Sequence, residues 1–137
     1  MKKLISILAV SLILISFSFM TAAERPDPWQ QAKERGVEFR AIGNEPGWHV
    51  EIYQDEKINF VNDYGSFELK VPIDDVWYGP EGEDRIYYVE NNLIQFQVIV
   101  MKKAYQDTMK GEEFPYQVRV LFPNASYIGG GRLLLDE

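Results

Sequence analysis

Three carboxylates lie in two segments of the chain that contain turn-forming residues. Glu45 falls within residues 43–48, and Asp107 and Glu112 fall within residues 105–115. Two carboxyl groups about 5–10 Å apart can carry out the acid–base chemistry of glycoside hydrolysis. The spacing along the sequence does not require these side chains to meet, so a glycan-acting enzyme remains an alternative hypothesis.

Other kinds of catalytic site need residues or motifs that the chain does not contain. His49 is the only histidine and there is no cysteine, which excludes a zinc site or a cysteine–histidine pair. No serine lies in a Gly-x-Ser-x-Gly turn. The acids at 74–75 and 81–84 lack the spacing of a known calcium loop, and we expect them to form a solvated rim. We therefore predict no catalytic residue, no metal and no cofactor, and a protein that acts by binding.

The same two turn segments supply most of the candidate binding residues. Asp107 also has a structural interpretation, because its side chain can accept hydrogen bonds from N–H groups two or three residues on and so close a turn at Gly111. Trp48 begins a strand in which positions 48, 50 and 52 share one face, so it also fits as an apolar plug of a β core. The binding residues that we predict are Glu45, Trp48, Asp107, Thr108, Met109, Glu112 and Arg132.

Residues 1–23 have the organisation of a bacterial-type secretory signal peptide. Lys2 and Lys3 precede an apolar run, and small residues at 21–23 provide the cleavage site. A retained membrane anchor is the alternative. We expect a periplasmic or secreted protein of the cell envelope.

The charge after cleavage limits the choice of partner. Residues 24–137 carry 21 acidic and 12 basic side chains, a formal net charge of −9. Binding to nucleic acid or to an anionic membrane surface needs clustered lysine and arginine, so both are disfavoured. A basic protein partner or another envelope component suits this charge.

Without cysteine, neither a disulfide nor acylation at the cleavage site is available. We separately expect the protein to be a monomer.

Beyond the leader the sequence predicts one domain. Residues 24–36 form a lead-in and a short helix that Asp27 caps and Gly36 ends, docked through Trp29. Residues 37–137 alternate as about eight strands with mostly hairpin connections, which is typical of a small antiparallel barrel or sandwich, and we expect a barrel-like domain of the all-β class. The predicted strands cover 37–42, 48–53, 57–62, 66–71, 85–90, 93–101, 116–122 and 127–135, with an irregular segment over 72–84.

Two further expectations concern the register and the interior. A two-residue turn at 91–92 would pair Val89 with Ile94 and Tyr87 with Phe96. Large side chains are expected to fill the barrel, which leaves a small-molecule-binding barrel as an alternative hypothesis. The predicted inward residues include Trp48, Phe60, Phe67, Phe96 and Phe122.

Three ordered motifs match one family pattern. Residues 39–48 match Phe-x-Ala-x-Gly-Asn-Glu-Pro-Phe-Trp, with Gly47 in place of the last phenylalanine. Residues 105–115 match Cys-x-Asp-x-Met-Ser-Gly-Glu-x-Phe-Pro, and residues 127–134 match Tyr-x-Gly-Cys-Gly-x-x-Leu, apart from the cysteines and one serine. The chain thus resembles a family of small bacterial envelope proteins and lipoproteins of uncharacterised function. Its barrel is similar in architecture to small envelope proteins that include membrane-bound lysozyme inhibitors, an analogy of fold alone.

The two cysteines of this family fall on Tyr105 and Gly130, and both are replaced here. Their joint loss is what a disulfide in the family implies, since a lone thiol is a liability in an oxidising compartment. The resemblance therefore implies that Tyr105 and Gly130 are neighbours, with the tyrosine ring over the glycine.

Overall fold

The computed structural model of the chain describes residues 24–44 and 46–135. The expected leader, the candidate Glu45 and residues 136–137 lie outside the described residues. The helix α2 covers Pro28–Glu34, and a 3-10 turn, η2, covers Asp63–Gly65. The strands are β1 (Phe39–Gly43), β2 (Trp48–Tyr53), β3 (Lys57–Asn62), β4 (Phe67–Pro72), β5 (Asp75–Tyr78), β6 (Arg85–Glu90), β7 (Gln95–Met101), β8 (Tyr105–Gln106), β9 (Glu113–Phe114), β10 (Tyr116–Phe122) and β11 (Ala125–Leu133).

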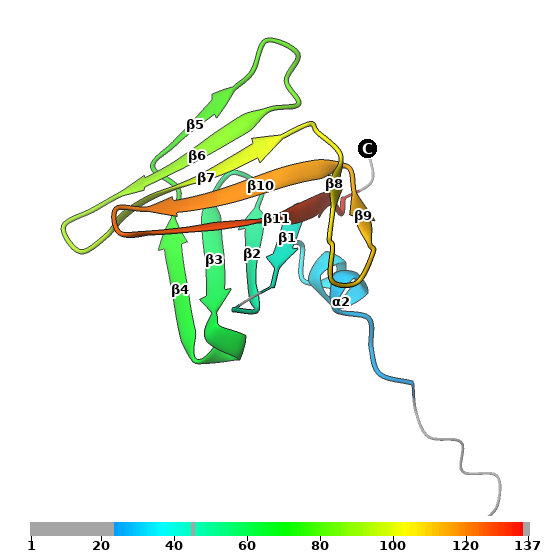
Figure 1. Cartoon of the computed structure of the whole chain (residues 1–137). Helices are drawn as coiled ribbons and strands as arrows, with labels where there is room; N and C mark the ends of the chain where they lie inside the picture. Colours follow the sequence, from blue (N-terminus) through cyan, green and yellow to red (C-terminus); the bar gives the residue numbers. More distant parts are fainter. Residues whose placement is uncertain (1–23, 45, 136–137) are drawn as a thin grey trace, which may run out of the picture.

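The expected all-β fold is confirmed. Nine strands form one antiparallel sheet in the order β4-β3-β2-β1-β11-β10-β7-β6-β5, and this sheet curls into a half-barrel (Figure 1). The short strands β8 and β9 form a separate pair. Every predicted strand is present with small shifts at its ends, whereas β5 lies in the segment that we expected to be irregular.

The inner face of the curled sheet holds the apolar core. The predicted inward residues Trp48, Phe60 and Phe96 are buried in it, at 4%, 1% and 2% exposure. Phe67 also lies on the core face, with its ring centroid 6.5 Å from that of Phe60, but it is 48% exposed and not buried as we expected, because β4 is the last strand of the sheet and no further strand covers it. Phe122 is partly buried and stacks on Phe96 with ring centroids 4.8 Å apart. The core is therefore filled at its centre and open along one edge.

The sheet does not close into a full barrel. β4 and β5 remain its two edges, although they are consecutive in the sequence. The two residues between them cross from one edge to the other. The Ile73 N–H donates to the Glu56 carbonyl, and the Asp74 N–H donates to the Tyr88 carbonyl, both at 2.9 Å. The two edges therefore meet at this link, and neither strand pairs with the other.

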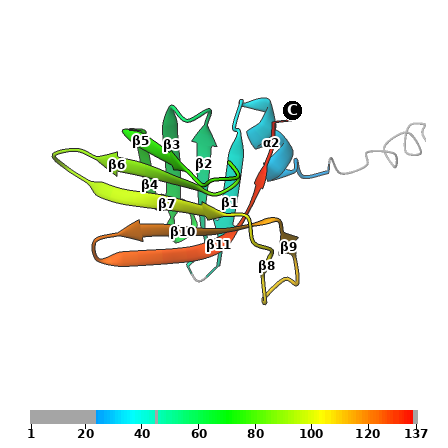
Figure 2. The same ribbon diagram turned by 90° about the horizontal axis from the view of Figure 1, so that it is seen from above.

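The helix docks at one end of the sheet, as its sequence predicts. The Asp27 side chain accepts from the Trp29 N–H at 3.1 Å, and Gly36 follows the helix with a φ of 87°, which glycine adopts without steric cost. The Trp29 ring lies 5.8 Å from the Phe114 ring of β9. Figure 2 shows α2 at the same end of the molecule as the β8–β9 pair.

The β6–β7 hairpin differs from its predicted register. Val89 pairs with Phe96 and Tyr87 with Val98, a shift of two residues. The turn is the cause: the Asn91 side chain accepts from the N–H groups two and three residues on, and so it stabilises a longer turn than the predicted one. A shift of two residues keeps every side chain on its predicted face of the sheet.

Candidate functional site

The two turn segments singled out by the sequence meet through one hydrogen bond. The Asn44 side-chain amide donates to Oδ2 of Asp107 at 2.7 Å, although the residues are 63 positions apart. A surface pocket of about 180 Å³ surrounds this bond, and we name this region the Asn44–Asp107 site. It is lined by Ile42, Gly43, Asn44, Tyr105, Asp107, Thr108, Met109, Phe114 and Ile128.

Trp48 supports the site from inside the core. Its indole ring lies against two glycines, where any Cβ atom would collide with it: a Cβ on Gly43 would lie 2.1 Å from the indole nitrogen, and one on Gly129 would lie 2.8 Å from Cζ2. The tryptophan is 4% exposed. Its structural interpretation as a core plug is therefore confirmed, and it does not line the pocket.

Asp107 organises the loop between β8 and β9. Its Oδ1 accepts from the Met109 N–H at 2.8 Å, and its carbonyl accepts from the Gly111 N–H at 2.7 Å. Its own N–H donates to the Glu112 carbonyl at 2.8 Å. Gly111 has a φ of 69°, in the left-handed region. The turn that we predicted from the sequence is therefore present.

These hydrogen bonds set the ionisation of Asp107. The Met109 N–H lowers the pKa of the carboxyl group, burial opposes this shift, and the Asn44 amide adds to it. Both carboxylate oxygens accept hydrogen bonds, so Asp107 is an ionised acceptor near neutral pH. Such a group holds the shape of a loop, and it is poorly suited to donate a proton to a substrate.

The loop presents its most exposed side chains at the tip. Met109 is 63% exposed, and Thr108 and Lys110 beside it are also exposed. A methionine side chain is flexible and apolar, so it adapts to irregular apolar surfaces. The loop therefore combines a framework held by hydrogen bonds with a flexible, exposed apolar side chain, that of Met109, at its tip.

Glu112 and Arg132 form an ion pair on the helix side of the loop. Arg132 donates to Oε1 of Glu112 at 3.1 Å and to the Glu113 carbonyl at 2.9 Å. Its guanidinium also lies 4.5 Å from the ring centroid of Phe114 and 5.0 Å from that of Trp29. Arg132 thus connects β11, the loop and α2, and neither member of the pair lines the pocket.

The ring that covers Gly130 belongs to Phe114. A Cβ on Gly130 would lie 2.3 Å from Cδ2 of that ring. Phe114 is the cross-strand partner of Tyr105 in the β8–β9 pair, and this pair packs beside β11. The end of the chain does return to the 105 region, but the aromatic cover comes from the strand paired with Tyr105 and not from Tyr105 itself.

Sequence reasoning missed a polar row on the outer face of the sheet. Strand pairing places five polar side chains side by side across β11, β1, β2, β3 and β4. The sequence did contain a signal for this row, because each of these side chains occupies an outward-facing position in its strand and the strands are neighbours in the sheet. In order, the row consists of Arg132, Arg40, Glu51, Asn59 and Lys70.

Glu51, at the centre of this row, is a buried carboxylate held by two arginines. Its side chain is 2% exposed, and it accepts from Arg40 at 2.7 Å and from Arg35 at 2.6 and 2.8 Å. Nε of Arg40 and Oδ1 of Asn59 are buried without a hydrogen-bond partner. The burial of Glu51 depends on Arg35, which follows the helix and lies over the strand.

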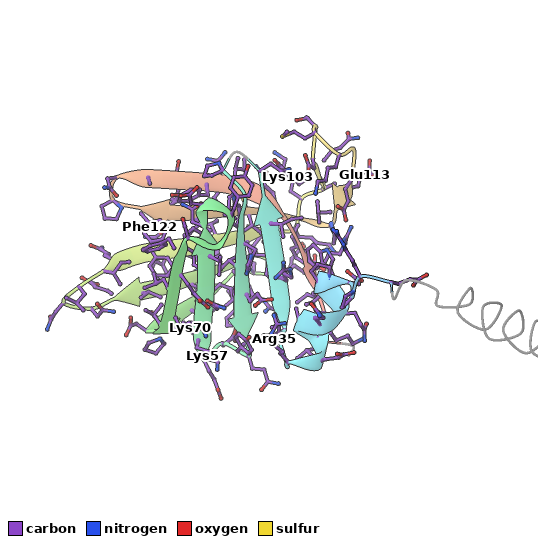
Figure 3. The ribbon with its side chains drawn as sticks, turned by 90° about the horizontal axis from the view of Figure 1, so that it is seen from below. Arg35, Lys57, Lys70, Lys103, Glu113 and Phe122 are labelled. Atoms are coloured by element: carbon purple, nitrogen blue, oxygen red, sulfur yellow. The ribbon has the colours of Figure 1, made fainter. Side chains whose placement is uncertain are left out.

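His49 lies on the same outer face, partly buried. Burial lowers its pKa from the ordinary value, and the nearby positive charge of Arg40 lowers it further. A surface pocket of about 540 Å³ next to it includes Arg35, Lys57 and Lys70 in its lining. Figure 3 shows these three cations on one side of the molecule.

Comparison of the chain with protein-family models, with curated proteins and with solved structures found no match. Within residues 24–44 and 46–135, no three His, Asp or Glu side chains are grouped so that they could hold a metal ion. In the same part of the chain, no helix has the length and apolar character needed to cross a membrane. The resemblance to envelope proteins therefore rests on the three sequence motifs.

Proposed function

We propose that this protein is an exported binding protein of the cell envelope, without catalytic activity, and that it engages a basic protein partner through the Asn44–Asp107 site. The observation that carries the proposal is the hydrogen bond between Asn44 and Asp107. It joins loops from distant parts of the chain into one surface, from which Thr108 and Met109 project into solvent.

The fixed conformation of the loop between β8 and β9 favours binding to a partner. Association costs less conformational entropy when the contacting segment is already fixed in the free protein. Asp107 fixes this segment through its bonds to Asn44 and Met109. Met109 would then supply apolar contact area to the partner, as methionine does on surfaces that accommodate varied ligands.

The distribution of charge supports attraction of a basic partner. Between residues 74 and 90, six exposed acids accompany one base, Arg85. None of the six lines the Asn44–Asp107 site, so they would speed the approach of the partner without contacting it in the pocket. Added salt should therefore slow association more than it speeds dissociation. The acids are Asp74, Asp75, Glu81, Glu83, Asp84 and Glu90.

The two alternative functions have less support. A small-molecule-binding barrel needs an apolar internal cavity, whereas Trp48, Phe60 and Phe96 occupy the interior. A glycan-acting enzyme needs a carboxylic acid that donates a proton, whereas both oxygens of Asp107 accept hydrogen bonds.

Photo-crosslinking in living cells tests the proposal. A photoreactive phenylalanine analogue replaces Met109 in the exported protein, and a matched control places it at Leu93, which is 96% exposed in the β6–β7 turn. We expect position 109 to capture a basic protein that position 93 does not capture. Equal capture from the two positions, or capture from neither, would contradict the assignment of the site.

A further inference from the structure

Hydrogen-bonded and non-hydrogen-bonded pairs alternate along the β3–β4 ladder, and this alternation shows which backbone N–H and C=O groups of β4 have no partner in β3. In an antiparallel ladder, residue pairs alternate between those that exchange hydrogen bonds and those that do not. The Ile73 N–H donates to the Glu56 carbonyl, in the register that continues the β3–β4 ladder. Counting back in steps of two, the N–H and C=O groups of Leu69 face β3. Those of Glu68 and Lys70 face away from it, toward the open edge.

Pro72 agrees with this assignment. It pairs with Lys57 at a position where an N–H group would face the open edge, so the proline costs the sheet no hydrogen bond. It also ends the row of outward N–H groups. Glu68 and Lys70 are therefore the two residues of β4 that offer both a free donor and a free acceptor.

The side chains of β4 are complementary to a second copy of β4. Glu68 and Lys70 lie on the outer face with side chains 50% and 72% exposed, and Phe67, Leu69 and Val71 alternate with them on the core side. When two β4 strands lie antiparallel with Leu69 opposite Leu69, each Glu68 faces Lys70 of the other copy. Each Phe67 likewise faces Val71 of the other copy.

Backbone and side chains favour the same register. With Leu69 on the two-fold axis, the outward groups of Glu68 oppose those of Lys70 in the second copy, and each such pair exchanges two hydrogen bonds. A shift by one residue would bring outward groups opposite inward ones and apolar side chains opposite charged ones. A shift by two residues would keep the backbone pairing but bring Glu68 opposite Glu68, or Lys70 opposite Lys70, so the charges exclude it.

We infer that β4 is the interface of a homodimer, in which two β4 strands pair antiparallel about an axis at Leu69. Figure 1 shows β4 at the side of the sheet, with no strand beyond it. A two-fold contact uses the same edge of both copies, so it closes on a dimer and does not propagate into a fibre. The contact is short, so the dimer is weak and forms as concentration rises. This departs from the monomer that we expected from the sequence.

The apolar surface beside β4 also favours a second copy over an unrelated strand. Phe67 is 48% exposed and lines a surface pocket of about 340 Å³ at the open edge, together with Phe60, Ile94 and Phe122. In the single chain Glu68 and Lys70 form an exposed ion pair with each other at 3.4 Å. An added strand would match β4 best with an apolar residue beside Phe67, a base opposite Glu68 and an acid opposite Lys70. The second copy supplies all three in one register.

Sedimentation velocity on the exported protein tests this inference through charge reversal. The weight-average sedimentation coefficient of the wild type should rise with concentration toward the value of a dimer. Glu68→Lys and Lys70→Glu should each weaken the dimer about tenfold or more, because each places like charges opposite one another twice. The double variant Glu68→Lys/Lys70→Glu should dimerise as the wild type does. An equimolar mixture of the two single variants should form a heterodimer.

A proline variant tests whether the dimer depends on hydrogen bonds between the two β4 backbones as well as on complementary charges. Lys70→Pro removes an N–H that faces the open edge, so it should abolish the dimer while leaving the β3–β4 ladder and the melting temperature close to those of the wild type. A wild type that stays monomeric at every concentration would overturn the inference. A dimer that persists in both single charge variants and in a folded Lys70→Pro variant would overturn it as well, because the interface would then lie elsewhere.

Discussion

The Asn44 amide donates to Oδ2 of Asp107 at 2.7 Å, and this bond fastens the end of β1 to the loop between β8 and β9. The same aspartate accepts from the Met109 N–H through Oδ1 and from the Gly111 N–H through its carbonyl. One residue therefore holds the loop in shape and holds it to the sheet. The order of the loop should depend on Asn44, although Asn44 is not part of it.

The first prediction concerns this dependence. Asn44→Ala removes one partner of Asp107, so the Met109 and Gly111 amides should exchange hydrogen for deuterium several-fold faster, while amides of the central strands keep their rates. Hydrogen exchange followed by mass spectrometry measures both. Asn124→Ala, in the exposed β10–β11 turn, is the matched control. Unchanged exchange in the loop of the Asn44 variant would show that the bond does not order it.

The second prediction concerns the buried carboxylate of Glu51. Glu51→Ala leaves the Arg40 guanidinium, whose side chain is 11% exposed, without its counter-charge. Removing one member of a buried ion pair destabilises a protein by about 3–5 kcal/mol. Urea denaturation should report a loss of this size. Glu56→Ala, an exposed acid at the β2–β3 turn, should change the free energy of unfolding by about 0.5 kcal/mol or less. Equal effects of the two variants would contradict a structural role for the Glu51 pair.

The third prediction concerns the contact between Gly129 and the end of β1. A Cβ at Gly129 would lie 2.0 Å from the Ile42 carbonyl oxygen, which belongs to the backbone and cannot rotate away. Gly129→Ala should therefore destabilise the protein by about 1–3 kcal/mol, as overpacking does in other cores. Thermal unfolding measures the loss. The control Ser126→Ala, at an exposed position of the same strand, should leave the melting temperature nearly unchanged.

The fourth prediction concerns pH. Burial and the charge of Arg40 lower the pKa of His49 in the folded protein, so protonation favours the unfolded chain. The folded protein is therefore most stable while His49 is neutral, above its unfolded pKa of about 6.5. This stability is lost as the pH falls from about 6.5 through the lower pKa of His49 in the folded protein. The melting temperature of the wild type should therefore fall as the pH drops below about 6.5, and His49→Gln should flatten this dependence. Asp107 loses its contribution only at lower pH, because the unfolded pKa of an aspartate is about 3.9. Equal slopes for wild type and variant over this range would exclude His49 as the cause.

Local sequence patterns predicted the helix and the long strands, because each of these elements depends on residues close together in the chain. Asp27 and Gly36 set the limits of α2, and alternation of apolar residues identified the long strands. The turn around Asp107 was predictable for the same reason, since its acceptor and its donors are neighbours in the sequence.

Features that depend on distant segments could not be predicted. The Asn44–Asp107 bond joins residues 63 positions apart, and their shared place in turn segments did not determine that they would meet. Glu51 occupies an outward position of its strand, and its burial depends on Arg35 and Arg40 lying over it. The open edge at β4 likewise depends on how far the sheet curls, which no single strand encodes.

The most direct test combines the shape of the loop with its proposed role. The photoreactive residue is placed at position 109 in an Asp107→Ala background, and the yield of the captured protein is compared with that in the parent, at equal protein levels and with the fold confirmed by circular dichroism. If the aspartate holds Met109 in a binding surface, the captured band falls to the level of the control at position 93. If the band stays as strong without the carboxylate, the Asn44–Asp107 site is not what the partner recognises.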